Sequence, residues 1–150
     1  MAVVGPGDAT PELEALAEAA GREVARRGGV VVCGGLGGVM EAAARGAKEA
    51  GGTALGILPG PDREAANPYV DVAVPTGLGE ARNALVVRAA DAVVALGGSY
   101  GTLAEIAFAL KAGKPVVGVG SWELAKDGRP VEAIARARTA EEAVAAALSD

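Results

Sequence analysis

Residues 92–105 read AVVALGGSYGTLAE: an apolar run, then a segment rich in glycine, then a segment with helical spacing. A continuous apolar run is typical of a strand buried on both faces of a parallel sheet. Glycines let the chain turn at the end of that strand, and Thr102 is a residue type that favours a helix start. This order presents backbone N–H groups and the positive end of a helix to an anion. The stretch therefore predicts a parallel α/β sheet that binds a phosphate at residues 97–102.

The same alternation of apolar runs and helical segments extends along the chain. We expect strands at residues 2–4, 30–33, 54–58, 70–74, 92–96, 115–119 and 133–135. We expect helices at residues 11–27, 39–50, 80–90 and 103–112, with a last helix capped by Thr139 and a polar loop at 59–68. Strands alternating with helices form right-handed crossovers. The predicted fold is α/β: a three-layer, Rossmann-like, doubly wound parallel sheet with helices on both faces, in a single domain of residues 1–150.

Composition narrows the class of function. The net charge of -5 and the pI near 4.8 argue against general binding of nucleic acid, which needs a basic face. The chain has no histidine, the commonest general base and metal ligand, so we expect no metal site. Its one cysteine, Cys33, lies inside an apolar run and is expected to be a small buried side chain. With no apolar stretch as long as a membrane span and no visible signal peptide, the expectation is a cytoplasmic protein.

Three glycine-bearing loops follow predicted strands, at Gly5 to Gly7, Gly34 to Gly38 and Gly97 to Gly101. Ligands of such sheets bind beyond the carboxyl ends of the strands, so we expect the three loops to meet at one edge. The alternative is that each loop is a tight connection without a ligand. The candidate ligand-binding residues are Gly5, Gly34, Gly35, Gly37, Gly38, Met40, Asn83, Gly97, Gly98, Ser99, Tyr100, Gly101 and Thr102.

Standard nucleotide signatures are absent. The chain contains no G-x-x-x-x-G-K-[ST] sequence, which argues against a P-loop ATPase. Gly35-Leu36-Gly37 could open a dinucleotide fingerprint, but Met40 stands where the last glycine or alanine belongs. An enzyme that uses NAD is therefore not expected.

Two charged residues are candidates for catalysis, Arg82 and Glu105. Arg82 lies near the start of its predicted helix and could bind a phosphate, whereas Arg88 is expected to be structural. Thr102 and Glu105 have the spacing of a capping box, in which the glutamate only closes the helix start, and this interpretation is favoured over catalysis. Trp122 either covers a ligand or packs against the last helix; packing is favoured.

Taken together, these segments resemble a Rossmann-like superfamily often labelled "lysine decarboxylase", which includes the LOG phosphoribohydrolases. That family has a P-G-G-x-G-T-x-x-E motif, which Gly101, Thr102 and Glu105 match, while Gly97 and Ser99 replace the proline and the second glycine. The run 34–40, GGLGGVM, resembles the family's earlier G-G-G-x-x-G-L-M turn, and Arg82 falls at its arginine. Asn83 stands where LOG enzymes usually have lysine. The pattern is closer to a sister branch that contains the molybdenum cofactor carrier proteins of algae.

The resemblance implies a phosphorylated, nucleotide-like ligand with its phosphate on the turn 97–102. In LOG enzymes the equivalents of Arg82 and Glu105 take part in cleaving the N-glycosidic bond of a nucleoside 5′-monophosphate. The leading hypothesis is therefore a nucleotide-binding protein with possible phosphoribohydrolase activity and no required cofactor, and not a lysine decarboxylase. The alternatives are a non-catalytic carrier of a pterin-type molybdenum cofactor, a nucleotide sensor, or a partner-binding domain with a vestigial pocket. Expected partners are the small phosphorylated ligand and a second copy of the chain, in a homodimer or higher oligomer, with no nucleic acid and no membrane.

Overall fold

The structure is a computed structural model that describes residues 1–149. Its main sheet has seven parallel strands in the order β4-β3-β2-β1-β5-β6-β9. These strands are β1 (Ala2–Val4), β2 (Val30–Cys33), β3 (Thr53–Leu58), β4 (Val72–Pro75), β5 (Val93–Leu96), β6 (Val116–Val119) and β9 (Ile134–Arg136). The doubly wound α/β fold predicted from the sequence is confirmed.

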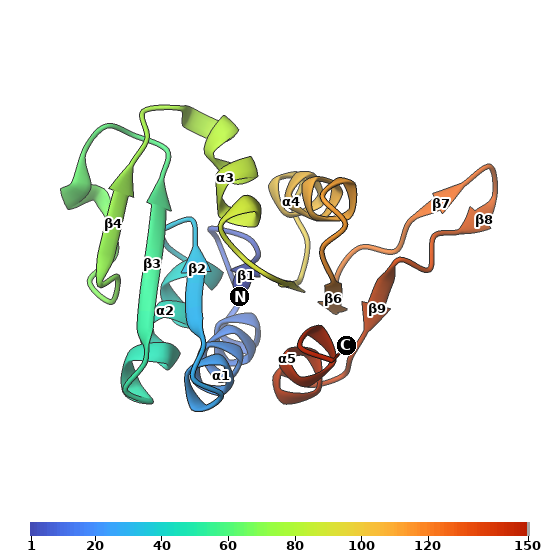
Figure 1. Ribbon diagram of the computed structural model, residues 1–150, viewed down its shortest axis with the longest axis horizontal. Helices are drawn as coiled ribbons and strands as arrows, with labels where there is room; N and C mark the ends of the chain where they lie inside the picture. Colours follow the sequence, from blue (N-terminus) through green and yellow to red (C-terminus); the bar gives the residue numbers. More distant parts are fainter. Residues whose placement is uncertain (150) are drawn as a thin grey trace.

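Helices cover both faces of the sheet, as Figure 1 shows. Helices α1 (Pro11–Arg26), α2 (Val39–Glu49) and α5 (Ala140–Ala147) pack on one face, and α3 (Arg82–Arg88) and α4 (Tyr100–Lys111) pack on the other. Each face of the sheet has its own hydrophobic core. Successive strand residues point to opposite faces, so Val3 lies in the core beneath α1, α2 and α5, and Val4 lies in the core beneath α3 and α4. Both cores consist mainly of alanine and valine, and these small side chains let the helices lie close to the sheet.

The close packing of α1 on α2 depends on glycine. A methyl group at Gly46 would lie 1.9 Å from the carbonyl oxygen of Glu18, and one at Gly21 would lie 1.9 Å from that of Ala43. Glu18 also binds Arg45 of α2 through its carboxylate, with 2.9 Å between Oε2 and Nε. The backbones of the two helices are thus in direct contact, which explains why glycines occur in the middle of otherwise helix-favouring segments.

Several element boundaries differ from the sequence-based prediction. Helix α3 begins only at Arg82, because the chain first makes a short 3-10 turn, η2 (Gly79–Ala81), and a second such turn, η1 (Arg63–Ala65), lies in the predicted polar loop. Helix α4 begins at Tyr100 rather than Leu103, because Ser99 caps it. The edge strand β4 begins at Val72, two residues later than expected, and β9 covers Ile134–Arg136 instead of 133–135.

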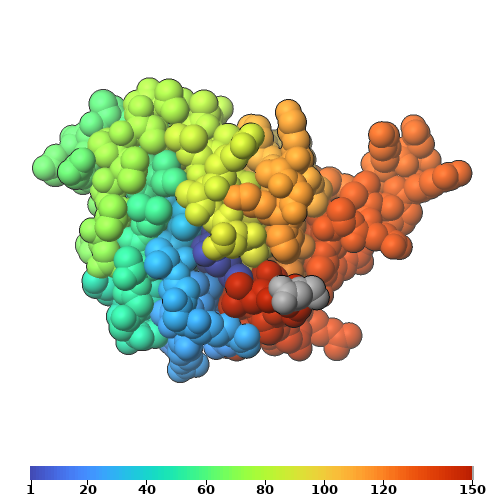
Figure 2. All heavy atoms as spheres, in the orientation of Figure 1, coloured from blue at the N-terminus to red at the C-terminus, as the bar shows by residue number. Residues whose placement is uncertain are grey.

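A small hairpin was missed by the sequence analysis. Strands β7 (Ala125–Lys126) and β8 (Arg129–Pro130) pair in antiparallel fashion around Asp127 and Gly128, which both have positive φ, at 51° and 74°. Asp-Gly is a strong hairpin turn signal, but the flanking residues lack the apolar alternation that marks a strand. The hairpin extends away from the body of the molecule (Figure 1; Figure 2).

Candidate functional site

The three glycine-bearing loops meet where β1, β2 and β5 end. The amide of Val39 donates to the carbonyl oxygen of Pro6 at 3.0 Å, which joins the loop after β2 to the loop after β1. A methyl group at Gly5 would lie 2.7 Å from the carbonyl oxygen of Leu96, so the first loop also touches the end of β5. Strand order reverses between β1 and β5, the place where open α/β sheets bind ligands. We call this region the carboxyl-edge site: residues 5–7, 34–40, 82–83 and 97–105.

Arg82 is held at the base of this site by the backbone. Only 9% of its surface is exposed, and its Nε donates to the carbonyl oxygen of Ile57 at 2.8 Å. Its Nη2 donates to the carbonyl oxygen of Gly34 at 3.3 Å, and its Nη1 donates to Asn83 Oδ1. A methyl group at Gly34 would lie 2.7 Å from Nη2, so this glycine makes room for the guanidinium. Arg82 therefore joins the ends of β2 and β3 to α3 and supplies a fixed positive charge, with few donors left for a ligand.

Met40 and Asn83 complete the surroundings of the guanidinium. Met40 Sδ lies 3.9 Å from Arg82 Nη2, and a methyl group at Gly7 would lie 3.6 Å from Met40 Cε. Asn83 accepts from Arg82 through Oδ1, and a methyl group at Gly101 would lie 3.9 Å from Asn83 Nδ2. Asn83 thus lies between the arginine and the glycine turn, while Met40 lies between the arginine and the first loop.

Glu105 is buried in the second turn of α4, with 9% of its surface exposed. Burial raises the pKa of its carboxyl to about 7, and the positive charge of Arg82 opposes that rise. Within residues 1–149 the carboxylate forms no hydrogen bond and no ion pair, with Arg82 or any other group. A carboxyl that titrates near neutrality can hold or release a proton at the pH of most cells.

The predicted capping box is wrong. The N-cap is Ser99, whose Oγ accepts from the amide of Thr102 at 3.4 Å and lies 3.2 Å from Thr102 Oγ1. Thr102 is itself in the first helical turn and only 1% exposed, so its hydroxyl cannot cap the helix from outside. Glu105 is then one turn beyond the position that could reach back to a cap. The structural role that sequence analysis favoured for Glu105 is absent.

Trp122 lies on the glycine turn rather than on the last helix, which corrects the favoured interpretation. Its Nε1 donates to the carbonyl oxygen of Ser99 at 3.0 Å, and a methyl group at Gly98 would lie 2.8 Å from that nitrogen. Its ring pairs with that of Tyr100, with 5.8 Å between centroids. The sequence could have predicted this position, because Trp122 follows the strand β6, which ends at the same edge of the sheet as its neighbour β5.

Cys33 has the buried position that was expected, while a structural role for Arg88 stays a prediction. Cys33 is fully buried, and burial raises the pKa of its thiol to about 11, so it is not an activated nucleophile. Arg88 is exposed at the end of α3, away from the hydrogen bonds that hold Arg82.

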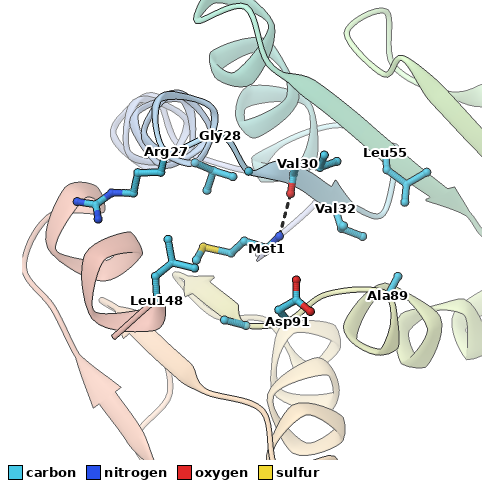
Figure 3. Close-up of a pocket in the computed structure, with 12 residues that line it drawn as sticks. Met1, Arg27, Gly28, Val30, Val32, Leu55, Ala89, Asp91 and Leu148 are labelled. Carbon is cyan, nitrogen blue, oxygen red and sulfur yellow. Dashed lines mark hydrogen bonds between the residues drawn. The ribbon is translucent and has the colours of Figure 1, made fainter. Parts of the chain in front are cut away.

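A cavity of about 420 Å³ lies at the opposite edge of the sheet (Figure 3). Its lining comes from β3, the starts of β1, β2 and β5, and the ends of α1, α3 and α5, and includes Met1, Arg27, Val30, Leu55, Asp91 and Leu148. Most of this lining is apolar, and Arg27 already pairs with Glu23 at 2.7 Å. None of the candidate residues from the sequence lines this cavity.

Within residues 1–149, no cluster of three or more His, Cys, Asp or Glu side chains is arranged to bind a metal ion. Among the helices described, none combines the length and the apolar character needed to cross a membrane.

Residues 1–146 match the SLOG cluster4 family model. Two solved structures are similar to the chain over nearly its full length. One is the molybdenum cofactor binding protein from the phototrophic bacterium Rippkaea orientalis, with 35% identity and a TM-score of 0.85, covering 96% of this chain and 91% of that one. The other is the molybdenum cofactor carrier protein from Chlamydomonas reinhardtii, with 35% identity and a TM-score of 0.81, covering 97% and 92%.

A more distant structure shares the fold alone. DNA processing protein A from Streptococcus pneumoniae is 16% identical with a TM-score of 0.74, and the match covers 99% of this chain and 62% of that one. At this identity the likeness carries no information about the ligand of the present chain.

Proposed function

This chain belongs to the SLOG cluster4 family, and we propose that it is a binding or carrier protein for a small phosphorylated ligand of the pterin type, the molybdenum cofactor. The observation that carries this proposal is the full-length similarity to two proteins described as binding or carrying that cofactor. The carboxyl-edge site supplies the matching chemistry. It has three glycine-bearing loops in contact and a buried guanidinium beneath them.

The phosphate is proposed to bind at the start of α4. The amides of Tyr100 and Gly101 are in the first turn of α4. Amides in the first turn have no partner within the helix, so these two are free to bind an anion at the start of α4. The positive end of the helix and the fixed charge of Arg82 both favour an anion there. Proposed contacts also come from the glycine-bearing loops, at the residues that the sequence analysis named: Gly5, Gly34, Gly35, Gly37, Gly38, Met40, Asn83, Gly97, Gly98, Ser99 and Thr102.

Carriage is favoured over hydrolysis by the environment of Arg82. Its three nitrogens donate to Ile57, Gly34 and Asn83. Few of its N–H groups are then left to bind a substrate as its charge changes during a reaction. Asn83 also replaces the lysine usual in the LOG enzymes that the chain resembles.

Glu105 supports a second candidate function, hydrolysis of a nucleoside 5′-monophosphate. A buried carboxyl without a partner and with a pKa of about 7 is suited to activating water or protonating a leaving base. Incubation with a panel of nucleoside monophosphates, followed by chromatography for free base, tests this. Base release that is lost in Glu105→Gln would replace the carrier proposal with a phosphoribohydrolase.

The carrier proposal is tested by loading. Purified protein is incubated without oxygen with molybdenum cofactor released from a molybdoenzyme and passed through gel filtration. Molybdenum is then measured by mass spectrometry and the pterin by fluorescence after oxidation. The proposal expects about one cofactor per chain to remain bound; loss of all cofactor during filtration would overturn it.

A matched pair of variants locates the phosphate. Gly101→Asp puts a carboxylate at the start of α4, where a Cβ has no neighbour closer than 3.8 Å and should be tolerated. Gly60→Asp makes the same change in a loop with no atom within 4 Å of the new Cβ. We expect retention to fall at least about tenfold in Gly101→Asp through repulsion of the phosphate, and to be unchanged in Gly60→Asp.

We further propose that the chain pairs with itself and does not bind nucleic acid. The net charge of -5 supports the second statement. Light scattering after gel filtration measures the oligomeric state, and a mobility shift with single-stranded DNA tests the absence of nucleic-acid binding.

A further inference from the structure

Aromatic side chains gather beside the carboxyl-edge site. The whole chain has one tryptophan, two tyrosines and one phenylalanine, and Trp122 and Tyr100 form a pair. Their ring centroids are 5.8 Å apart and their planes are inclined by 33°. The two residues come from different elements, the loop after β6 and the first turn of α4. In a chain so poor in aromatic residues, the meeting of two at this turn requires an explanation.

Trp122 packs against the core on the α3–α4 face of the sheet, but core packing does not explain Tyr100, which is 82% exposed. Trp122, by contrast, is fixed in place. Its Nε1 donates to the carbonyl oxygen of Ser99, and it lies against Gly98, where a Cβ would come within 2.8 Å of Nε1. The indole is therefore a rigid support attached to the glycine turn, and most of the Tyr100 side chain remains in solvent beside it.

The loop that carries Trp122 also contains an unsatisfied polar atom. Ser121 Oγ is completely shielded from solvent and has no hydrogen-bond partner within residues 1–149. It lines, with Trp122, a cavity of about 120 Å³ that continues along the ends of β6 and β9. Buried hydroxyls usually have a partner, so this one is an exception beside Trp122.

We propose that Tyr100 and Trp122 form a stacking platform for the planar heteroaromatic ring of the ligand whose phosphate binds at the start of α4. This inference rests on the proposed function and specifies the part of the ligand that lies next to the glycine turn. Aromatic faces bind planar rings by offset stacking. The ring then lies on the β6 side of the turn, with the phosphate at the turn itself.

The test uses the same cofactor loading, with Tyr100→Ala, Tyr100→Phe and Phe108→Ala. Phe108 is an exposed aromatic residue of the same helix, away from the turn, and serves as the matched control. Since Trp122 is the only tryptophan, its fluorescence reports directly on the platform. We expect Tyr100→Ala to weaken cofactor binding about fivefold or more, and Tyr100→Phe and Phe108→Ala to bind as the unaltered protein does. Loading should also quench the Trp122 emission.

The outcomes separate this inference from the function on which it rests. If the unaltered protein loads, Tyr100→Ala loads equally well and Trp122 emission does not change, the platform is refuted while the carrier proposal stands. If the unaltered protein does not load at all, both are refuted. Weakening in Tyr100→Phe equal to that in Tyr100→Ala would assign the effect to the hydroxyl and would also overturn stacking.

Discussion

At the scale of single residues, the carboxyl-edge site depends on two charges that are buried together and not paired. Arg82 is neutralised in part by backbone carbonyl oxygens, whereas Glu105 has no hydrogen-bond donor within the described residues. Removing a carboxylate from water without a partner is costly, so the site favours the protonated form of Glu105 until the pH approaches 7. A bound phosphate would strengthen this preference, because a second negative charge nearby disfavours ionisation further.

Glu105 makes the stability of the protein depend on pH. The carboxyl has an ordinary pKa of 4.5 in an unfolded chain and a pKa of about 7 in the folded protein, so between these values the folded state binds more protons. Stability contributed by this group is therefore complete below pH 4.5 and falls as the pH rises to about 7. Glu105→Gln removes the titration. The free energy of unfolding of Glu105→Gln minus that of the unaltered protein should therefore rise by roughly 3 kcal/mol between pH 4.5 and pH 7.5.

Urea unfolding of both proteins across this pH range measures the difference. Parallel pH profiles would mean that Glu105 titrates as an ordinary exposed carboxyl, and the description of it as a buried, unpaired acid would be wrong.

At the scale of elements, most strands follow directly from the sequence because every predicted strand except the last ends at a glycine or a proline. The start of α4 was harder to predict. Both Ser99 and Thr102 are good N-cap residues, and only the path of the chain after β5 decides between them. Gly101, a poor helix former, then lies inside the helix. The hairpin β7–β8 and the 3-10 turn before Arg82 were missed because short exposed elements have little apolar pattern.

The cap assignment predicts the effect of changing Ser99. Ser99→Ala removes the oxygen that accepts from the Thr102 amide and should lower the free energy of unfolding by about 1 kcal/mol. Ser99→Asp keeps an acceptor at the same position and should lower it by no more than a few tenths of a kcal/mol. Urea unfolding of the three proteins tests this, and equal stability of Ser99→Ala and the unaltered protein would show that the cap lies elsewhere.

The meeting of the three glycine-bearing loops was predictable from the sequence, and the internal geometry of the candidate site was not. Parallel strands bring the loops after β1, β2 and β5 to one edge, so their meeting followed from topology. The bonds from Arg82 to Ile57 and Gly34 depend on how far α3 lies from β3 and β2, which no local pattern encodes. The same holds for Trp122, which reaches the turn across a neighbouring strand.

At the scale of the whole molecule, the two edges of the sheet offer different environments. The carboxyl edge has glycine-bearing loops, the positive end of α4, Arg82 and an aromatic pair. The amino edge has a cavity of about 420 Å³ that Arg27, Gly28 and Gly29 help to line, and it lacks the start of α4, Arg82 and the aromatic pair (Figure 3). The features proposed to recognise an anion lie at the carboxyl edge.

The central claim is that a phosphorylated pterin binds at the carboxyl edge, and mapping amide chemical shifts by NMR tests it most directly. The uniformly ¹⁵N-labelled protein, at 14.6 kDa, is titrated with neopterin 3′-monophosphate, which carries both the ring and the phosphate. The account predicts that the largest shifts fall on the amides of residues 34–38 and 97–102, with the Trp122 indole N–H shifting alongside them. Largest shifts around Val30, Asp91 and Leu148, which line the cavity at the other edge, or no shifts at all, would contradict it.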